Sequence, residues 1–210
     1  MRWPCLFFDL DGTLVDSLPD LAAAINRLRR GQNLPDLDLA RVRSYVGDGA
    51  TALVRRALPE GGFSQRMLDT FLADYGRNLC VATRPYPGIP ELLGDLRNRT
   101  LAVITNKPQA MARKLLQELK LASHFRLVLG GDSCTGKKPA PDQILLVLRT
   151  LELAPSDCLM IGDHHTDLRA AQAAGIESCF CGWGYGNDGG ESPSLRADSV
   201  AELVAQLNLP

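Results

Sequence analysis

The chain has 210 residues, of which 45% are hydrophobic and 22% charged, so it can bury a full core and is neither a disordered nor a fibrous protein. Its formal net charge of -1 excludes a bulk basic field that would recruit nucleic acid or an anionic membrane. No long apolar stretch precedes Asp9, so we expect no signal peptide or membrane span there, and a cytoplasmic location.

The first elements are a strand and a helical segment. The apolar run Cys5–Phe8 predicts a buried strand. From residue 16 to residue 86, apolar residues such as Leu21 and Ile25 recur at helical spacing, which predicts a separate helical unit. Its exit at residues 84–88, Arg-Pro-Tyr-Pro-Gly, is stiff and rich in turn residues, as a linker back to another unit would be.

After residue 87, short apolar runs alternate with segments of helical period. The predicted strands are Leu101–Ile104, Arg126–Leu129, Cys158–Ile161 and Glu177–Phe180. The predicted helices are Ile89–Arg97, Gln109–Leu119, Asp142–Leu151 and Thr166–Ala174. This alternation is typical of a parallel sheet flanked by helices. We therefore predict an α/β fold in which residues 1–15 and 87–210 form a doubly wound parallel sheet, with the helical unit 16–86 inserted.

Polar residues follow several of these strands at the point where each strand ends. Asp9 and Asp11 follow the first strand, Thr105 and Asn106 the second, and Asp163 a later one. Any one of them could be a helix cap or a turn residue. Ligands of open parallel sheets, however, bind beyond the carboxyl ends of the strands, and the repetition predicts a ligand site at this edge.

Four segments resemble the motifs of the haloacid dehalogenase-like hydrolases. Residues 9–17, DLDGTLVDS, resemble the opening signature of that family. Residues 105–107, TNK, resemble its second motif, residues 137–141, KKPAP, its third, and residues 162–167, GDHHTD, its fourth. The motifs occur in the family's order. The resemblance implies a Rossmann-like core and a small α-helical cap domain, residues 16–86, that closes over the site.

The resemblance also implies a mechanism for removing a phosphoryl group from a small phosphorylated metabolite. Asp9 would be the nucleophile that forms an aspartyl-phosphate, and Asp11 the general acid and then base. Thr105 and Asn106 would donate hydrogen bonds to the phosphoryl oxygens, and Lys138 would offer a cation to the phosphate and to Asp9. Because dehalogenases of the family lack the second Asp, the presence of Asp11 favours phosphoryl chemistry.

By the same resemblance, the cofactor is Mg²⁺. Its ligands would be Asp9, the main-chain carbonyl of Asp11, and Asp163, a set of oxygens of the kind that Mg²⁺ prefers. Asp167 would support these ligands without contacting the ion directly.

Two pairs of adjacent residues, one of lysines and one of histidines, lie in the third and fourth motifs. Lys137 lies next to Lys138, but the family's spacing before Pro-x-Pro favours Lys138. A small residue often follows the Asp of the fourth motif, whereas this chain has His164 followed by His165. We expect neither histidine to ligate the metal, because adjacent side chains project differently and Mg²⁺ selects oxygen over imidazole.

Within the family, the pattern is most similar to that of phosphoglycolate phosphatases. The matching segments are Arg41–Ala50, Tyr86–Gly88, Gly130–Asp132 and Gly184–Gly186. The implied reaction is hydrolysis of 2-phosphoglycolate to glycolate and phosphate by a monomer or homodimer. Arg41 or Arg43 would meet the substrate carboxylate, or else both would merely lie on a solvated helix face.

Three alternatives remain open at this point. The first is a phosphatase of sugar phosphates or amino-sugar phosphates, which has a similar cap. The second is a phosphomutase on the same fold, which also carries the acid/base Asp. The third is a non-catalytic binding protein, which would be expected to lack the nucleophile or the Lys, and this chain lacks neither.

Overall fold

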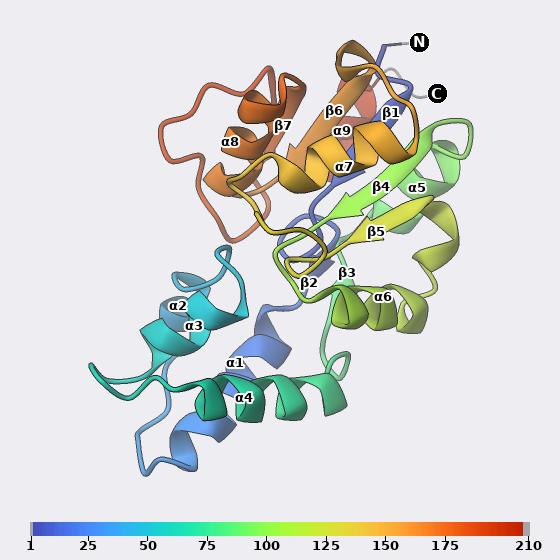
Figure 1. The fold of residues 1–210 in the computed structure, drawn as a ribbon. Coiled ribbons are helices and arrows are strands. Elements are labelled where there is room, and N and C mark those ends of the chain that lie inside the picture. Colours follow the sequence, from blue (N-terminus) through green and yellow to red (C-terminus); the bar gives the residue numbers. More distant parts are fainter. Residues whose placement is uncertain (1, 208–210) are drawn as a thin grey trace.

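A six-stranded parallel sheet forms the centre of the computed structural model, which describes residues 2–207 (Figure 1). Its strands lie in the order β5-β4-β1-β6-β7-β8, and each pair of neighbours is parallel. Their bounds are β1 (Cys5–Phe8), β4 (Thr100–Ile104), β5 (Leu127–Leu129), β6 (Cys158–Gly162), β7 (Glu177–Cys181) and β8 (Leu195–Ala197).

Helices cover both faces of this sheet, because successive residues of each strand point to opposite sides. On one face Leu6 and Phe8 belong to a core cluster shared with α5 (Ile89–Asp95), α6 (Gln109–Glu118) and α9 (Val200–Gln206). On the other face Cys5 and Phe7 pack in a cluster with α7 (Asp142–Thr150) and α8 (His165–Ala174). Two short 3₁₀ helices are η1 (Ala122–His124) and η2 (Pro155–Asp157). The α/β class and the doubly wound sheet are confirmed.

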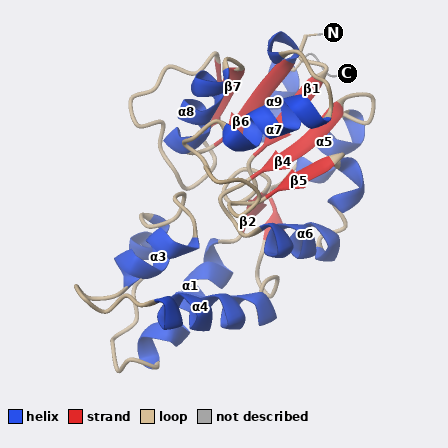
Figure 2. Cartoon of the chain, in the orientation of Figure 1, coloured by secondary structure: helices blue, strands red, loops and turns tan. Residues whose placement is uncertain are grey.

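Four helices form a second unit beside the carboxyl edge of the sheet (Figures 1 and 2). They are α1 (Leu18–Arg30), α2 (Leu39–Arg43), α3 (Ala50–Ala57) and α4 (Gln65–Arg77). The two chain segments that connect this unit to the sheet pair as a short antiparallel ribbon of β2 (Val15–Asp16) and β3 (Arg84–Pro85). The helices lie within the predicted segment 16–86, and the treatment of that segment as a cap domain stays a prediction.

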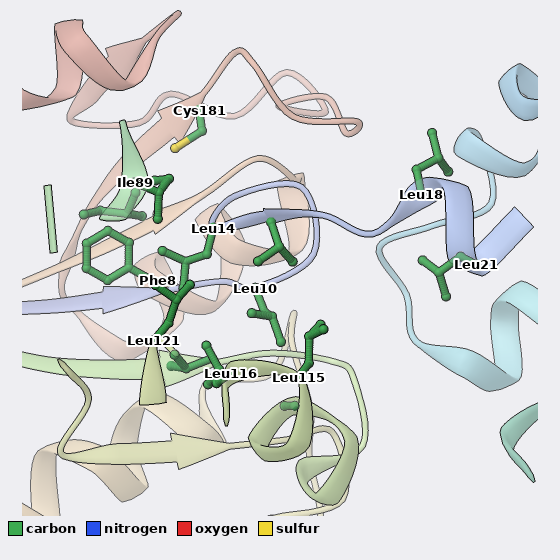
Figure 3. Packing of buried hydrophobic residues seen from close by; sticks show 14 of the residues in the cluster. Phe8, Leu10, Leu14, Leu18, Leu21, Ile89, Leu115, Leu116, Leu121 and Cys181 are labelled. Carbon is green, nitrogen blue, oxygen red and sulfur yellow. The ribbon is translucent and has the colours of Figure 1, made fainter. Parts of the chain in front are cut away.

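Buried apolar side chains continue from the sheet into the helical unit (Figure 3). Phe8 on β1, Leu10 and Leu14 in the following loop, and Leu18 and Leu21 on α1 belong to one cluster. The loop after β1 is therefore held by packing on both sides. Among residues 2–207, no helix is long and apolar enough to cross a membrane.

Several predicted element boundaries were wrong by one or two residues. The helix predicted over Ile89–Arg97 ends at Asp95, and the strand predicted from Arg126 begins at Leu127. The last strand, β8, and the last helix, α9, were not predicted. Strand β8, which pairs with β7, has the sequence Leu-Arg-Ala with its Arg exposed, so it shows no apolar run in the sequence.

Candidate active site

The carboxyl ends of the central strands bring predicted site residues together. The chain places β4 on one side of β1 and β6 on the other, so β1 lies where the strand order reverses. Asp9 directly follows β1, Thr105 follows β4, and Asp163 follows β6. Ligands of such sheets bind in the crevice at this reversal. The structure thus places these three residues at the edge that the sequence predicted.

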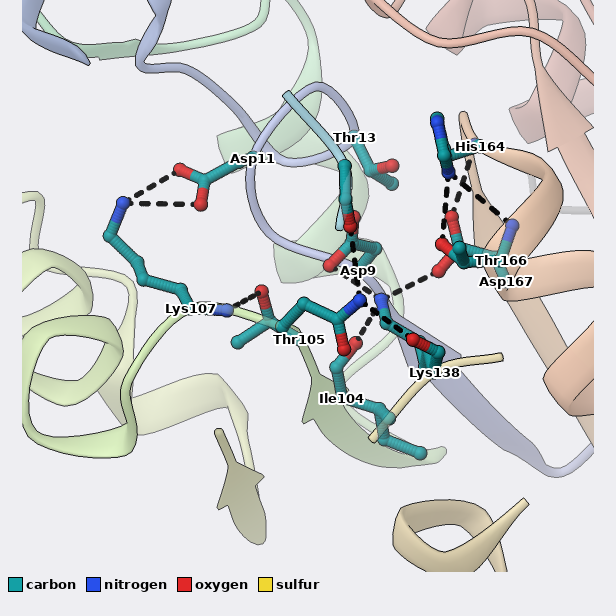
Figure 4. A network of polar contacts seen from close by, with 12 residues as sticks. Asp9, Asp11, Thr13, Ile104, Thr105, Lys107, Lys138, His164, Thr166 and Asp167 are labelled. Carbon is teal, nitrogen blue, oxygen red and sulfur yellow. Dashed lines mark hydrogen bonds and ion pairs between the residues drawn. The ribbon is translucent and has the colours of Figure 1, made fainter. Parts of the chain in front are cut away.

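Lys138 is a buried cation that joins Asp9 to Asp167 (Figure 4). Its Nζ lies 2.8 Å from Oδ1 of Asp9 and 2.6 Å from Oδ1 of Asp167, and it donates a hydrogen bond of 2.8 Å to the carbonyl of Ile104. Burial lowers the pKa of the Lys138 ammonium, but Asp167 and Asp9 outweigh this effect and raise it. Lys138 therefore stays charged and holds the Asp9 carboxylate in place.

Asp9 is itself largely buried, and burial raises the pKa of its carboxyl to about 6 against the opposing charge of Lys138. Although Oδ1 of Asp9 lies close to the Lys138 ammonium, that approach is not aligned as a hydrogen bond, and this oxygen accepts none within residues 2–207. A buried carboxylate oxygen without an aligned donor favours a further positive partner.

Asp163 is oriented by three donors from two loops. Its Oδ1 accepts a hydrogen bond of 3.0 Å from Thr13 Oγ1, and its Oδ2 accepts bonds of 2.9 and 3.0 Å from the amides of Tyr185 and Gly186. The loop after β1 approaches so closely that a Cβ on Gly12, where φ is +91°, would lie 2.3 Å from Oδ2 of Asp163. Only glycine fits there. Burial, with the neighbouring Asp9 and Asp167, raises the pKa of Asp163 to about 7.

These carboxylates fit a hard divalent cation. One oxygen each from Asp9, Asp163 and Asp167 lies within 4.8 Å of the others, and all three residues are buried. Asp167 is already engaged through both oxygens, by Lys138 and by the main-chain amide of His164, so it orients its neighbours. Burial and mutual repulsion raise the pKa values of Asp9 and Asp163, and Oδ1 of Asp9 has no aligned hydrogen-bond donor within residues 2–207, so a cation shared by these carboxylates would stabilise their charged forms.

Asp11 is held apart from this cluster by contacts to other residues (Figure 4). Its Oδ1 accepts a hydrogen bond of 2.5 Å from Ser17 Oγ, and its two oxygens lie 2.9 and 3.1 Å from Nζ of Lys107. Lys107 also donates to the Tyr75 hydroxyl of α4 at 2.6 Å. Burial opposes the charge of Lys107, but Asp11 and Tyr75 raise the pKa of this ammonium. The predicted acid/base residue is thus linked to the helical unit through Lys107.

Thr105 and Asn106 line the same pocket as Asp9, and they make different hydrogen bonds. The Asn106 amide donates to the carbonyl of Lys138 at 2.9 Å and to the carbonyl of Gly47, in the helical unit, at 3.0 Å. Both of its donors therefore hold loops together, which was not predicted. Thr105 Oγ1 accepts a bond of 3.2 Å from the Lys107 amide, and its hydroxyl hydrogen remains available to a ligand.

Lys137, His164 and His165 lie around the neighbouring loop of the helical unit. Lys137 donates to the carbonyl of Asp48 at 2.8 Å, so it does not contact Asp9 as Lys138 does. His164 caps α8, and burial lowers the pKa of its imidazole to about 4. Its ring packs against His165, and ligand atoms of both lie within 4.8 Å of one from Asp48. That neither histidine ligates the predicted Mg²⁺ stays a prediction.

Arg41 and Arg43, predicted to meet a substrate carboxylate, do not line the pocket beside Asp9. Arg41 is exposed and its guanidinium lies over the Tyr45 ring and bonds to its hydroxyl. Arg43 donates to the carbonyls of Gly184 and Tyr185 at 2.7 and 3.2 Å. Their guanidinium groups are engaged elsewhere, so in this conformation the geometry gives neither a role at the substrate.

A pocket of about 50 Å³ opens between the sheet edge and the helical unit. The sheet side contributes polar residues, among them Asp9, Asp11 and Lys107. The helical unit contributes residues that are mostly apolar, namely Leu21, Val46, Gly47, Gly49, Ala50, Leu53, Phe71, Leu72 and Tyr75. The pocket combines an apolar wall with convergent polar groups at one end, as small-molecule sites do.

Sequence reasoning missed the contacts that Lys107 and Tyr75 make beside the pocket. Lys107 stands inside the second motif, and its position after Asn106 was the one available signal. Tyr75 fitted the apolar spacing of a predicted helix, and nothing in the sequence shows that its hydroxyl reaches across to the sheet.

Comparisons with known proteins agree with this arrangement. A family model described as haloacid dehalogenase-like hydrolase matches residues 6–181. The phosphoglycolate phosphatase of Chromobacterium violaceum is 40% identical over 205 residues, which cover 93% of this chain and 92% of that protein. That of Pseudomonas putida is 39% identical over 213 residues, covering 95% of this chain and 78% of that protein. The crystal structure of a predicted phosphoglycolate phosphatase from Haemophilus somnus superimposes with a TM-score of 0.91 at 32% identity, covering 99% of both chains.

Proposed function

Because the chain belongs to the haloacid dehalogenase-like hydrolases, we propose that it is a phosphatase that hydrolyses 2-phosphoglycolate to glycolate and phosphate. Its relatives with this activity in their names match over more than nine-tenths of the chain, which supports a phosphoric monoester hydrolase. The observation that carries the proposal is the Asp9 carboxylate, which lines the pocket and is held by the buried Lys138.

The lining of the pocket favours a small acid over a sugar phosphate. Among the described residues of the helical unit that line it, Tyr75 is the only one with a polar side chain. A sugar with several hydroxyls would leave those groups without partners when the pocket closes, which is costly. In 2-phosphoglycolate the one alcohol oxygen is esterified, so no free hydroxyl needs a partner, and its two anionic ends fit a site whose polar groups lie on one side.

In the proposed mechanism, Asp9 and Asp11 divide the chemistry. An Asp9 oxygen attacks phosphorus, the bond from phosphorus to the glycolate oxygen breaks, and Asp11 gives that oxygen its proton. Asp11 then takes a proton from the water that attacks the aspartyl-phosphate, which releases phosphate and restores Asp9. Thr105 donates to a phosphoryl oxygen, while Lys138, oriented by Asp167, keeps Asp9 aimed at the substrate. Asn106 supports the site by holding its loops.

Mg²⁺ is the cofactor that we propose, held by Asp9, the main-chain carbonyl of Asp11, and Asp163. It would supply the positive charge that offsets the phosphoryl oxygens. The three buried carboxylates, with one Asp9 oxygen lacking an aligned donor, support this choice over a soft metal.

The proposal extends to the protein's setting. All six cysteines are unpaired, four of them buried, as in proteins of a reducing compartment, which supports a cytoplasmic location. The substrate would be a free phosphorylated metabolite, handled by a monomer or a homodimer.

Phosphate release tests the proposal directly. The purified protein with Mg²⁺ is assayed against 2-phosphoglycolate and against a panel of about a hundred phosphorylated metabolites. We expect the highest kcat/KM for 2-phosphoglycolate, and background rates for all substrates with Asp9→Asn. A sugar phosphate hydrolysed with a higher kcat/KM would overturn the substrate assignment, and isomerised product without free phosphate would indicate a mutase.

A further inference from the structure

Lys107 is the one cation among the described residues that line the pocket. The other charged residues of the lining are Asp9 and Asp11, both carboxylates. Lys138 is bound to Asp9 and Asp167 and is absent from the lining. A substrate with a second anionic group therefore meets a single positive side chain in this pocket once its phosphate lies at Asp9.

The surroundings of Lys107 place two hydrogen-bond donors side by side. The Lys107 ammonium, with 3% of its side chain exposed, donates to the Tyr75 hydroxyl at 2.6 Å. Because that hydroxyl accepts from Lys107, its own hydrogen is free, and it is donated to no residue within 2–207. Tyr75 is buried and comes from α4, whereas Lys107 follows β4, so the pair bridges the helical unit and the sheet.

Within residues 2–207, the one carboxylate paired with the Lys107 ammonium is Asp11, at 2.9 and 3.1 Å. In the proposed mechanism Asp11 must turn to the leaving oxygen of the substrate. A buried ammonium that loses its carboxylate partner is strongly destabilised unless another anion replaces it. A substrate carboxylate on Lys107 would be that replacement.

From these contacts we propose that Lys107 and Tyr75 form a carboxylate-binding subsite, which selects phosphomonoesters that carry a carboxylate beside the ester carbon. The inference rests on the proposed phosphatase function and assigns the residues that would bind the substrate carboxylate. Arg41 and Arg43 are engaged by Tyr45 and by the carbonyls of Gly184 and Tyr185, away from the pocket lining.

The test compares two substrates that differ only at the proposed contact. One is 2-phosphoglycolate, and the other is 2-hydroxyethyl phosphate, in which CH₂OH replaces the carboxylate. The quantity measured is the ratio of their kcat/KM values, so effects on Asp11 that are common to both substrates cancel. The variants are Lys107→Met, Lys107→Arg and Tyr75→Phe, and Lys137→Met is the control with the same change of charge at a lysine outside the lining.

We expect Lys107→Met to lower the ratio by about tenfold to a hundredfold, the size of a lost charge-assisted hydrogen bond. Tyr75→Phe should lower it by roughly three- to tenfold, because a neutral hydrogen bond is lost. Lys107→Arg should keep most of the preference, and Lys137→Met all of it. A ratio for Lys107→Met within twofold of the Lys137→Met value overturns the subsite. If Lys107→Met does not fold, an unchanged ratio in Tyr75→Phe overturns it instead.

Inhibition by glycolate separates this proposal from the proposed function. With p-nitrophenyl phosphate as the substrate, glycolate should inhibit the wild type competitively, and Lys107→Met should weaken that inhibition by at least about tenfold. A wild type that is inhibited in this way but does not hydrolyse 2-phosphoglycolate would refute the proposed substrate and retain the subsite. Equal inhibition of wild type and Lys107→Met would refute the subsite and retain the phosphatase.

Discussion

Replacing Lys138 with methionine removes the cation from a buried group of carboxylates. The Lys138 ammonium lies 2.8 Å from Asp9 and 2.6 Å from Asp167, and only 1% of its side chain is exposed. Breaking a buried ion pair by removing one partner costs about 3–5 kcal/mol, because the remaining charges stay buried. For a chain of this size about 1 kcal/mol corresponds to roughly 2–4 °C in Tm, so Lys138→Met should lower the Tm by roughly 6–20 °C.

The assay is thermal unfolding in EDTA, so that added metal does not replace the missing charge. The control is Lys137→Met, which changes the same residue type one position earlier and removes only a bond to the Asp48 carbonyl. The difference in Tm between the two variants should shrink from pH 8 to pH 5, because the unpaired carboxylates can then bind protons. About 1 kcal/mol corresponds to roughly 2–4 °C in Tm, so a Tm for Lys138→Met within about 2 °C of the Lys137→Met value would mean a loss of no more than about 1 kcal/mol. That result would refute a buried ion pair of the expected strength.

Three further predictions concern pH, the choice of metal and Arg43 of α2. Because burial raises the folded-state pKa of Asp163 to about 7 from an ordinary value of 3.8, the metal-free protein should lose stability as the pH rises from about 4 to 7. Unfolding in EDTA should show a smaller loss for Asp163→Asn, and an equal loss in both proteins would contradict this. Ca²⁺ should compete with Mg²⁺ and inhibit, because its looser coordination lets Asp9 bind through both oxygens; full turnover of stripped enzyme with Ca²⁺ would show the opposite. Arg43→Ala should lower kcat/KM equally for 2-phosphoglycolate and 2-hydroxyethyl phosphate, because Arg43 holds loop carbonyls. A loss of kcat/KM for 2-phosphoglycolate alone would indicate that Arg43 contacts the substrate carboxylate.

The fold was predictable because its signals are local. Each of these strands is a short apolar run, and this pattern located β1, β4, β5 and β6 to within about one residue. The helical unit was predictable because apolar residues recur at helical spacing after Asp16. Strand β8 was missed because its three residues, Leu-Arg-Ala, have an exposed Arg at the centre and so form no apolar run, unlike Leu-Val-Leu in the other edge strand, β5.

The site was predictable where its residues lie in motifs and unpredictable where its contacts cross between units. Asp9 and Asp163 converge because parallel strands end at the same edge, and Lys138 reaches Asp9 from the loop between β5 and α7. The bond from Lys107 to Tyr75 depends on how α4 packs against the sheet, and sequence spacing carries no information on that packing. Arg41 and Arg43 were proposed from a segment resemblance, with a solvated helix face as the alternative, because the sequence does not show which way α2 faces.

The central claim is that Asp9 becomes phosphorylated while Asp11 moves the protons. It is tested most directly with Asp11→Asn and an aryl phosphate, whose good leaving group needs little protonation. The variant should release a burst of phenol and then stall, because the second step lacks its base, with steady turnover reduced by roughly a hundred- to ten-thousandfold. Acid quench followed by mass spectrometry of the peptides should find phosphate on Asp9, and Asp9→Asn should show neither burst nor adduct. Phosphate on another residue, or near-normal turnover by Asp9→Asn, would contradict the account.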